Sequence, residues 1–383
     1  MKILVIGAGR MGLGAAFDLA NSPDVEAVTV ADIYPELAEK VVSRIGSPKL
    51  SAAVIDVNDY RKTVEMMRGH NAAISCVVYK HNLALAMAAI ESKVSFCDLG
   101  GNNSVVDSEL ALDGQAREAG INIIPDCGLA PGLVSLLVAH GAARFERLNK
   151  IRIRVGGLPQ RPKGPLEYQI TFSVEGLINE YVEPARVIRG GRIVEIESMT
   201  EVETLEFPPP FGTMEAFQTS GGASTLPDSF LGSVEELDYK TIRYPGHCER
   251  FKLLIDLGLA SSRPINIDGM PVAPRSVLAE LLLRHFPSDE PDVVLIRIEF
   301  AGREGGRDRL LTYDLADYFD EKTGLSAMMR MTAFPVSIIA QMMARGEISP
   351  KGAIPQEKCV PVDIFVAALA ERGIRISERL IDS

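Results

Sequence analysis

The first twelve residues constrain the fold more than any other stretch of the chain. Lys2 to Ile6 read KILVI, a short apolar run typical of a buried strand, and the sequence GAGRMG follows from Gly7 to Gly12. The next residues, GAAFDLA, have helical composition. A Gly-x-Gly-x-x-Gly sequence between a strand and a helix is the fingerprint of dinucleotide-binding sheets.

Each glycine of this sequence has its own physical reason. Gly7 permits a tight turn, Gly9 lets a pyrophosphate approach the backbone, and Gly12 lets the helix pack close to the strand. The phosphates would then bind free N–H groups at the positive end of the helix. We therefore expect Arg10 and Met11, which start that helix, to lie beside the cofactor as well.

An acidic residue ends the second apolar run, Ala27 to Ala31. Asp32 lies about 20 residues beyond the glycines, where a carboxylate binds the ribose hydroxyls of adenosine. That carboxylate would repel a 2′-phosphate, and neither Ile33 nor Tyr34 is an Arg that accepts one. The sequence therefore predicts NAD rather than NADP. The alternative is a structural glycine turn in which Asp32 caps a helix.

Short apolar runs alternate with helical stretches up to about residue 125, which predicts a doubly wound parallel sheet, an α/β fold. Ligands bind beyond the carboxyl ends of such strands. At these ends we expect further cofactor contacts from Asp56, Val57, Cys76, Val77 and Val78. Asp56 suits the amino group of adenine, and it suits a helix cap equally well.

Polar residues at the later strand ends are candidates for substrate chemistry. Tyr79 follows the fourth apolar run, and Asp98 precedes two glycines at the end of the fifth. Cys127 lies in PDCGLAPG, after the sixth run. Two adjacent glycines in such a loop usually indicate an unusual φ or the close approach of a ligand.

The pattern changes near Asn149. Residues 150–159 alternate in polarity, and the runs at 296–302 and 309–317 form a late pair, as in strands joined by hairpins. Another strand is expected at residues 167–173. These features predict a second domain of α+β character on a mixed or antiparallel sheet.

The predicted second domain interrupts the first. We assign residues 1–128 and 323–383 to the dinucleotide-binding domain and residues 129–322 to an inserted substrate domain. The last stretch is rich in helical sequence, so we expect no new strands there and a return to the first domain. Its methionine-rich helix is expected to pack in the core.

The sequence TIRYPGH places Arg243 and Tyr244 on a strand and His247 just after a Pro-Gly turn. Arg offers a rigid fork for a carboxylate, and His has a pKa matched to proton transfer near neutrality. The alternatives are a surface role for Arg243 and a loop cap for His247. Glu175 is a weaker candidate for binding a substrate amine.

The composition narrows the class of partner. The 383 residues carry a net charge of −11, which argues against nucleic acid. Five cysteines lack paired or zinc-type spacing, so we expect no metal and a reducing, cytoplasmic setting. No uninterrupted apolar stretch approaches the ~20 residues of a membrane span, so no membrane partner is expected.

These motifs together resemble the saccharopine dehydrogenase family, and within it the lysine 6-dehydrogenases. The similarity covers the whole chain, and its most specific stretches are CDLGGN, CGLAPG and RYPGH. It implies a Rossmann domain interrupted by a substrate domain, and homodimers formed through the substrate-domain sheet. Ala130 stands where saccharopine reductases often have Asp, and Asp32 departs from their preference for NADP.

The resemblance also implies an activity. Tyr79, Asp98 and Cys127 would line the substrate site near the nicotinamide, and Arg243 would approach a substrate carboxylate. The reaction implied is NAD-dependent oxidative deamination of the 6-amine of L-lysine, in which the imine left by hydride transfer is hydrolysed to a semialdehyde and ammonia. Asp98, His247 and Tyr79 are the candidates for proton transfer, and Asp98 is better suited to partner the amine.

Two other functions remain open from the sequence. A saccharopine or carboxynorspermidine type of reaction on a secondary amine needs a second carboxylate site, for which Arg152, Arg154 and Arg161 are candidates. A non-catalytic NAD-binding protein would keep the glycines and Asp32 but lose the polar residues of the substrate site.

Overall fold

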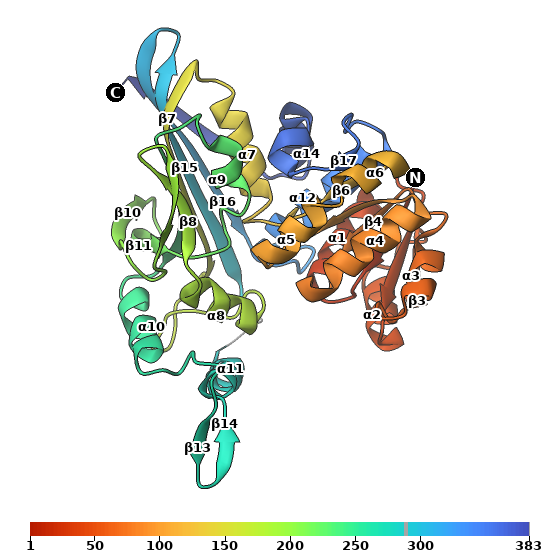
Figure 1. The fold of residues 1–383 in the computed structure, drawn as a ribbon, viewed down its shortest axis with the longest axis horizontal. Helices are drawn as coiled ribbons and strands as arrows, with labels where there is room; N and C mark the ends of the chain where they lie inside the picture. Colours follow the sequence, from red (N-terminus) through yellow and green to blue (C-terminus); the bar gives the residue numbers. More distant parts are fainter. Residues whose placement is uncertain (287–289, 383) are drawn as a thin grey trace. The chain divides into compact units, whose positions relative to one another are not determined.

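The computed structural model describes residues 1–286 and 290–382 (Figure 1). The chain forms two compact units, each of which is described by itself. The first unit contains residues 1–143, 224–229 and 329–375. The second contains residues 144–223 and 230–328 and the end of the chain from Ile376.

A parallel sheet forms the centre of the first unit. Its strand order is β17-β6-β5-β4-β1-β2-β3, and every neighbouring pair is parallel. The strands are β1 (Lys2–Ile6), β2 (Ala27–Asp32), β3 (Leu50–Val54), β4 (Ala72–Ser75), β5 (Ser95–Asp98), β6 (Asn122–Ile124) and β17 (Gly352–Ala353). This arrangement confirms the predicted doubly wound fold.

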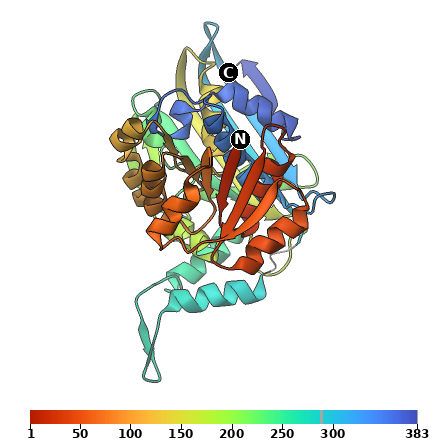
Figure 2. The same cartoon turned by 90° about the vertical axis from the view of Figure 1, so that its right-hand side faces the viewer.

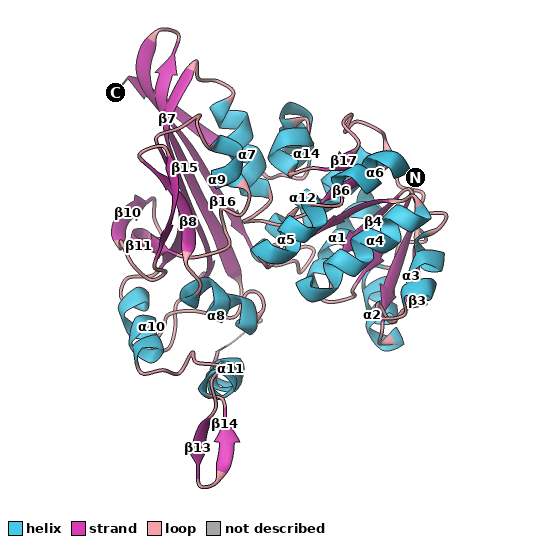
Figure 3. Ribbon diagram, viewed as in Figure 1, coloured by secondary structure: helices cyan, strands magenta, loops and turns pink. Residues whose placement is uncertain are grey.

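Helices cover both faces of this sheet because its central strand is apolar on both sides (Figure 3). Leu4 and Ile6 of β1 pack in one cluster with buried residues of α3, α4 and α6. Val5 points to the opposite face, where α1 packs with α12. The helices are α1 (Arg10–Asn21), α2 (Pro35–Ile45), α3 (Tyr60–Met67), α4 (Asn82–Ser92), α5 (Asn103–Leu110), α6 (Asp113–Ala119), α7 (Leu133–Ala142), α12 (Ala327–Ala344), α13 (Gln356–Cys359) and α14 (Val362–Glu371).

The methionine-rich helix α12 is a core helix, as predicted. Met331 and Met342 are fully buried. By length and composition the helix is apolar enough to cross a membrane, but 83% of its most apolar window is buried inside the protein. A buried polar contact joins it to the fingerprint helix, since Ser337 Oγ donates to Asp18 Oδ2 at 2.6 Å.

A mixed sheet forms the second unit. Its main order is β10-β11-β12-β7-β15-β16-β18, with β8 pairing β12 and β9. Only the β12–β7 pair is parallel among the described strands. The strands are β7 (Arg147–Pro159), β8 (Ala185–Arg189), β9 (Arg192–Ile196), β10 (Glu203–Phe207), β11 (Gly212–Gln218), β12 (Glu236–Arg243), β15 (Asp292–Glu304), β16 (Arg307–Tyr318) and β18 (Ser377–Asp382). The predicted α+β character and the late hairpin are confirmed.

Helices and a small hairpin complete the second unit. Helices α8 (Val174–Val182), α10 (His247–Asp256) and α11 (Pro274–His285) contribute to one apolar cluster. Figure 2 shows the separate hairpin of β13 (Ile265–Ile267) and β14 (Met270–Val272) beside α11. Helix α9 (Leu226–Phe230) begins in the first unit and ends at the first residue of the second.

Three predictions about the chain's organisation differ from the structure. Residues 167–173 form no strand; Tyr168 and Ile170 are buried as loop residues against α8 and α10, which explains their alternation. The C-terminal stretch does contain a new strand, because β18 pairs with β16 and belongs to the second unit. The units divide after residues 143 and 328 rather than 128 and 322, because α7 packs with α13 and α14.

Substitution of Asp18 tests how helix α1 is held in the first unit. It is 5% exposed and accepts hydrogen bonds from Ser337 Oγ and from Arg372 Nε, both at 2.6 Å. We expect Asp18→Ala to lower the free energy of unfolding by about 3 kcal/mol, because it leaves the Arg372 charge without its buried partner. Urea denaturation measures this change. The control Asp24→Ala, at an exposed position, should change the unfolding free energy by less than about 0.5 kcal/mol.

Candidate functional site

The glycine turn in the first unit has the geometry that a bound pyrophosphate requires. Gly7 has φ +103°, and a Cβ on Gly12 would lie 1.8 Å from the Gly7 carbonyl oxygen, so neither position tolerates a side chain. A Cβ on Gly9 would meet no atom within 4 Å. The space beside Gly9 is therefore open, at the N-terminus of α1, where Arg10 and Met11 begin the helix. This fits the predicted phosphate site.

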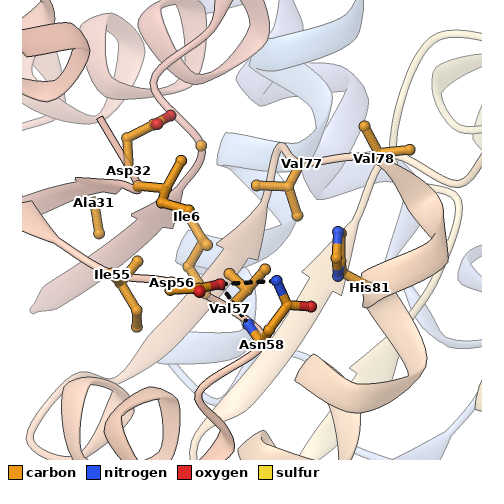
Figure 4. A pocket seen from close by; sticks show the side chains of 12 residues that line it. Ile6, Ala31, Asp32, Ile55, Asp56, Val57, Asn58, Val77, Val78 and His81 are labelled. Atoms are coloured by element: carbon orange, nitrogen blue, oxygen red, sulfur yellow. Dashed lines mark hydrogen bonds between the residues drawn. The ribbon is translucent and has the colours of Figure 1, made fainter. Parts of the chain in front are cut away.

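A pocket of about 160 Å³ lies at the carboxyl ends of the strands next to this turn (Figure 4). Six of the predicted cofactor residues line it: Gly7, Asp32, Asp56, Val57, Val77 and Val78. Cys76 lies one residue before the lining, and its N–H donates to the carbonyl of Ile6. The lining is mostly apolar with two carboxylates, which suits an adenosine moiety.

Asp32 joins the glycine turn to this pocket. Its Oδ2 accepts the N–H of Ala8 at 2.7 Å, and its Oδ1 accepts the N–H of Tyr34 at 3.0 Å. The carboxylate is thus fixed at the end of β2, and each oxygen still has a lone pair for a ribose hydroxyl. Its place in the pocket fits the predicted role.

Asp56 does not cap a helix. Asp59 performs that role for α3, since its side chain accepts from the N–H of Lys62. Asp56 instead accepts from the backbone and side-chain nitrogens of Asn58, at 2.9 and 2.8 Å. Figure 4 shows His81 on the opposite side of the pocket from Ile55. Asn58 and His81 were not among the predicted cofactor residues, because each follows its strand by several positions.

Three carboxyl groups are buried together beyond β5 and β6. Asp98 and Glu109 are fully buried, and Asp126 is 2% exposed. Asp98 Oδ1 accepts the N–H of Gly100 at 2.6 Å, and Ser224 Oγ donates to Asp126 Oδ2. A Cβ on Gly100 would lie 1.8 Å from Asp126 Oδ1, which explains the first of the two adjacent glycines.

The carboxyl groups of Asp98 and Glu109 are not fully hydrogen-bonded. Neither Asp98 Oδ2 nor the two oxygens of Glu109 has a hydrogen-bond donor within reach in the described part of the chain. Burial raises the pKa of both carboxyl groups, and the charge of Asp98 raises that of Glu109 further. Burial, with the charge of Asp98, also raises the pKa of Asp126 to about 8. Two neighbouring buried acids of this kind favour a state in which at least one of them is protonated.

Asp98 uses one carboxylate oxygen for the fold. Its Oδ1 holds the loop that follows β5, and its Oδ2 is buried without a hydrogen-bond partner in the described part of the chain. Cys127 is likewise fully buried, with its thiol against the carbonyls of Ile124 and Pro125. Tyr79, in the short helix η1 (Tyr79–His81), is half-buried, and its ring lies against Gly101.

A second polar cluster lies in the second unit, around Arg243 at the end of β12. Arg243 is 3% exposed; its Nε donates to the hydroxyl of Tyr181 and its Nη1 to the carbonyl of Ile242, both at 2.9 Å. Its guanidinium carbon lies 4.7 Å from the centre of the Tyr168 ring. Its Nη2 makes no hydrogen bond with any described residue. Arg243 is therefore a buried cation with one free arm, not a surface residue.

His247 is a fixed neutral residue rather than a free base. Its Nδ1 lies 2.9 Å from the carbonyl oxygen of Leu166, and its Nε2 lies 3.1 Å from the hydroxyl of Tyr181. Because a carbonyl only accepts, Nδ1 carries the proton and Nε2 accepts from Tyr181. Burial and the charge of Arg243 lower the pKa of His247 to about 3. Both ring nitrogens of His247 therefore contact neighbours in the second unit.

Two other residues predicted to bind substrate, Tyr244 and Glu175, make contacts within the protein instead. The hydroxyl of Tyr244 donates to the carbonyl of Pro159 at 2.8 Å. Glu175 is exposed on α8 and pairs with Arg275 at 2.8 Å. These contacts give both residues a structural role in the second unit. The sequence analysis did not identify Glu109 as a buried acid. The apolar residues near it in the same helix are the one sequence signal of its burial.

No group of three or more His, Cys, Asp or Glu side chains is arranged to hold a metal ion within residues 1–286 and 290–382.

The raised pKa of the buried Glu109 carboxyl group predicts that the stability of the protein depends on pH. A carboxyl group whose pKa is higher in the folded protein stabilises the fold at low pH, and this contribution is lost as the pH rises above the unfolded pKa. Glu109→Gln removes one such group while keeping its shape. We expect the unfolding free energy of the variant, relative to the wild type, to rise between pH 5 and pH 8 by about 1.4 kcal/mol per pH unit at most. Urea denaturation at several pH values measures this, and the exposed control Glu118→Gln should show no such slope.

Two family models match the chain. Residues 3–124 match the saccharopine dehydrogenase NADP binding domain, and residues 128–374 match the saccharopine dehydrogenase C-terminal domain. The saccharopine dehydrogenase [NADP(+), L-glutamate-forming] of Schizosaccharomyces pombe is 21% identical, over 100% of this chain and 99% of its own length. The carboxynorspermidine synthase of Vibrio cholerae is 24% identical, over 98% of this chain and 96% of its own length.

A solved structure shows the same fold over the full length. Apo saccharopine dehydrogenase (L-Glu forming) from Saccharomyces cerevisiae aligns with a TM-score of 0.82 at 20% identity, covering 99% of each chain. Since one family model alone spans more than half of the sequence, this chain belongs to the saccharopine dehydrogenase family.

Proposed function

We propose that this protein catalyses the NAD-dependent oxidative deamination of the 6-amine of L-lysine. The chain is a pyridine-nucleotide oxidoreductase of the class that acts on CH–NH donors, as its relatives are by name. Within that class, the proposal specifies NAD as the cofactor and L-lysine as the substrate. It rests on Asp32 for the cofactor and on Arg243 for the substrate.

The observation that carries the substrate assignment is the uncommitted arm of Arg243. Three cations are buried in the described part of the second unit: Arg154, Lys240 and Arg243. Arg154 pairs with Glu203 and with Asp238, and Lys240 lies 3.3 Å from Glu203. Arg243 alone among these three has no carboxylate partner, so it is the one prepared to receive a carboxylate from a ligand.

A single prepared carboxylate site favours a substrate with one carboxylate. L-Lysine has one, whereas a secondary amine made by joining two amino acids has more. Of the residues considered for a second site, Arg154 is occupied and Arg152 is 44% exposed and faces Glu299. Arg161 is an exposed loop residue. These placements favour the primary amine over the secondary amine.

The chain's own groups account for binding and orientation. Arg243 holds the carboxylate, and Tyr181 and His247 hold Arg243 in place through the chain of hydrogen bonds that ends at Leu166. When bound, NAD supplies the nicotinamide that accepts the hydride. Tyr79 is the predicted proton-transfer residue whose hydroxyl has no hydrogen bond within the described chain, so we assign proton transfer to it.

A panel of amines tests the proposal directly. We expect reduced nicotinamide and ammonia to form from L-lysine with NAD, and neither saccharopine nor carboxynorspermidine to support comparable rates. Turnover of a secondary amine only, without ammonia, would instead assign the protein to the other reaction of its family. Tight NAD binding with no turnover of any amine would favour a non-catalytic protein and sink the proposal.

Asp32→Asn tests the choice of cofactor. Asn keeps an acceptor for the N–H of Ala8 but removes the charge that repels a 2′-phosphate. We expect the ratio of kcat/KM for NAD to that for NADP to fall at least about tenfold, equivalent to about 1.4 kcal/mol. Asp56→Asn, in the same pocket, is the matched control and should leave this ratio unchanged. An unchanged ratio in Asp32→Asn as well would show that the carboxylate does not select the cofactor.

A further inference from the structure

The hairpin of β13 and β14 forms a two-stranded sheet of its own within the second unit. It projects from the beginning of α11 in Figures 1 and 2. Every residue from Ser261 to Pro271 is exposed. An isolated two-stranded hairpin is at best marginally stable in water. What specifies this hairpin, and what covers it, are therefore separate physical questions.

The turn of the hairpin is specified by its sequence. Asp268 and Gly269 both have positive φ, +51° and +85°, as a type I′ turn requires. Asp-Gly is one of the residue pairs that favour this turn. The side chain of Asn266 accepts the N–H of Gly269 at 2.8 Å and holds the turn further. The hairpin is therefore a defined element, and its remaining need is a surface that packs against it.

One face of the hairpin is apolar and open to solvent. Ile265 lies opposite Val272 and Ile267 lies opposite Met270, so these four side chains share one face. Ile265, Ile267 and Met270 are 53%, 47% and 64% exposed. Contiguous exposed apolar side chains mark sites of protein association. This face is therefore the surface on which a partner is expected.

The edges of the hairpin are less suited to a partner than its face. Pro264 directly precedes β13, and Pro271 lies within β14. Proline has no backbone N–H to donate to an added strand. Proline on an edge is one of the ways in which proteins prevent strand addition. A partner is therefore expected to pack on the side chains and not to extend the sheet.

Two opposite charges lie at the two ends of the hairpin. Arg263 is at its base and Asp268 is in the turn at its tip, and they are the only charged residues between Ser261 and Ala273. Neither side chain forms an ion pair with another residue of the described chain. If two copies lie antiparallel about a two-fold axis, the tip of each meets the base of the other. Each Asp268 then faces the Arg263 of the other copy, so the hairpin is complementary to itself, as a two-fold interface requires.

We propose that the β13–β14 hairpin binds the same hairpin of a second copy of this chain, apolar face to apolar face and antiparallel across a two-fold axis. Ile265, Ile267 and Met270 of the two copies bury one another, and Arg263 and Asp268 form two symmetric ion pairs. Any apolar partner could cover the face, but the match between the two charges is a property of two identical hairpins. This surface is separate from the large mixed sheet, and the inference does not depend on the proposed function.

Charge reversal in the full-length protein tests the contact. Arg263→Asp brings two acids together in each pair, and Asp268→Arg brings two cations together. In sedimentation velocity at low ionic strength, where ion pairs are screened least, we expect each variant alone to have half the mass of the wild type. An equimolar mixture of the two variants should recover the wild-type mass, because each pair then joins opposite charges. Arg192→Asp, at an exposed residue that begins β9, is the control and should keep the wild-type mass.

A neutral variant tests the apolar face separately. Ile267→Ser should also halve the mass, and mixing it with either charge variant should not restore it. Far-UV circular dichroism and binding of NADH show whether each variant is folded. A monomeric wild type would overturn the proposal in favour of a different partner for this face. A mass that all variants retain would overturn it as well, and so would a loss of mass in the charge variants that their mixture does not recover.

Discussion

The close approach of Gly12 to the carbonyl of Gly7 is the constraint on which the first unit depends. A Cβ added to Gly12 would lie 1.8 Å from the carbonyl oxygen of Gly7, so the contact admits no side chain. The contact also fixes where β1 ends and α1 begins. Asp32 then fastens the end of β2 to the same turn through the N–H of Ala8. The glycine turn and Asp32 therefore form one connected element, and the position of α1 is in turn fixed by Asp18 in the core.

The buried charged residues of the two units have different partners. Beyond β5 and β6, Asp98 organises a loop through Oδ1, and burial raises the pKa of Asp98 and of Glu109. Around β12, Arg243 is held by the hydroxyl of Tyr181 and the carbonyl of Ile242 and pairs with no carboxylate of the described chain. The difference follows from charge, because a buried acid can become neutral by taking up a proton, whereas an Arg stays charged.

The sequence was sufficient for features that depend on local pattern. The parallel sheet, the glycine turn, Asp32 at the end of β2 and the core packing of α12 all follow from apolar runs and their periodicity. Features that depend on contacts between residues distant in sequence could not be predicted from local sequence patterns. His247 is neutral because Leu166 and Tyr181 lie against it, and β18 is a strand because β16 offers an edge. Residues 167–173 show the same limit, since alternation also arises in a loop packed on helices.

Specificity in such a fold can change without changing the architecture. At 20% identity, the saccharopine dehydrogenase of Saccharomyces cerevisiae shares the fold over 99% of each chain. In our proposal, the charge of Asp32 selects between NAD and NADP, and the unpaired arm of Arg243 selects the substrate carboxylate. Both residues also make structural contacts, Asp32 with the N–H of Ala8 and Arg243 with Tyr181. Relatives named for saccharopine and for carboxynorspermidine both match at least 98% of this chain, so sequences of one family, alike over this length, carry names for different amines.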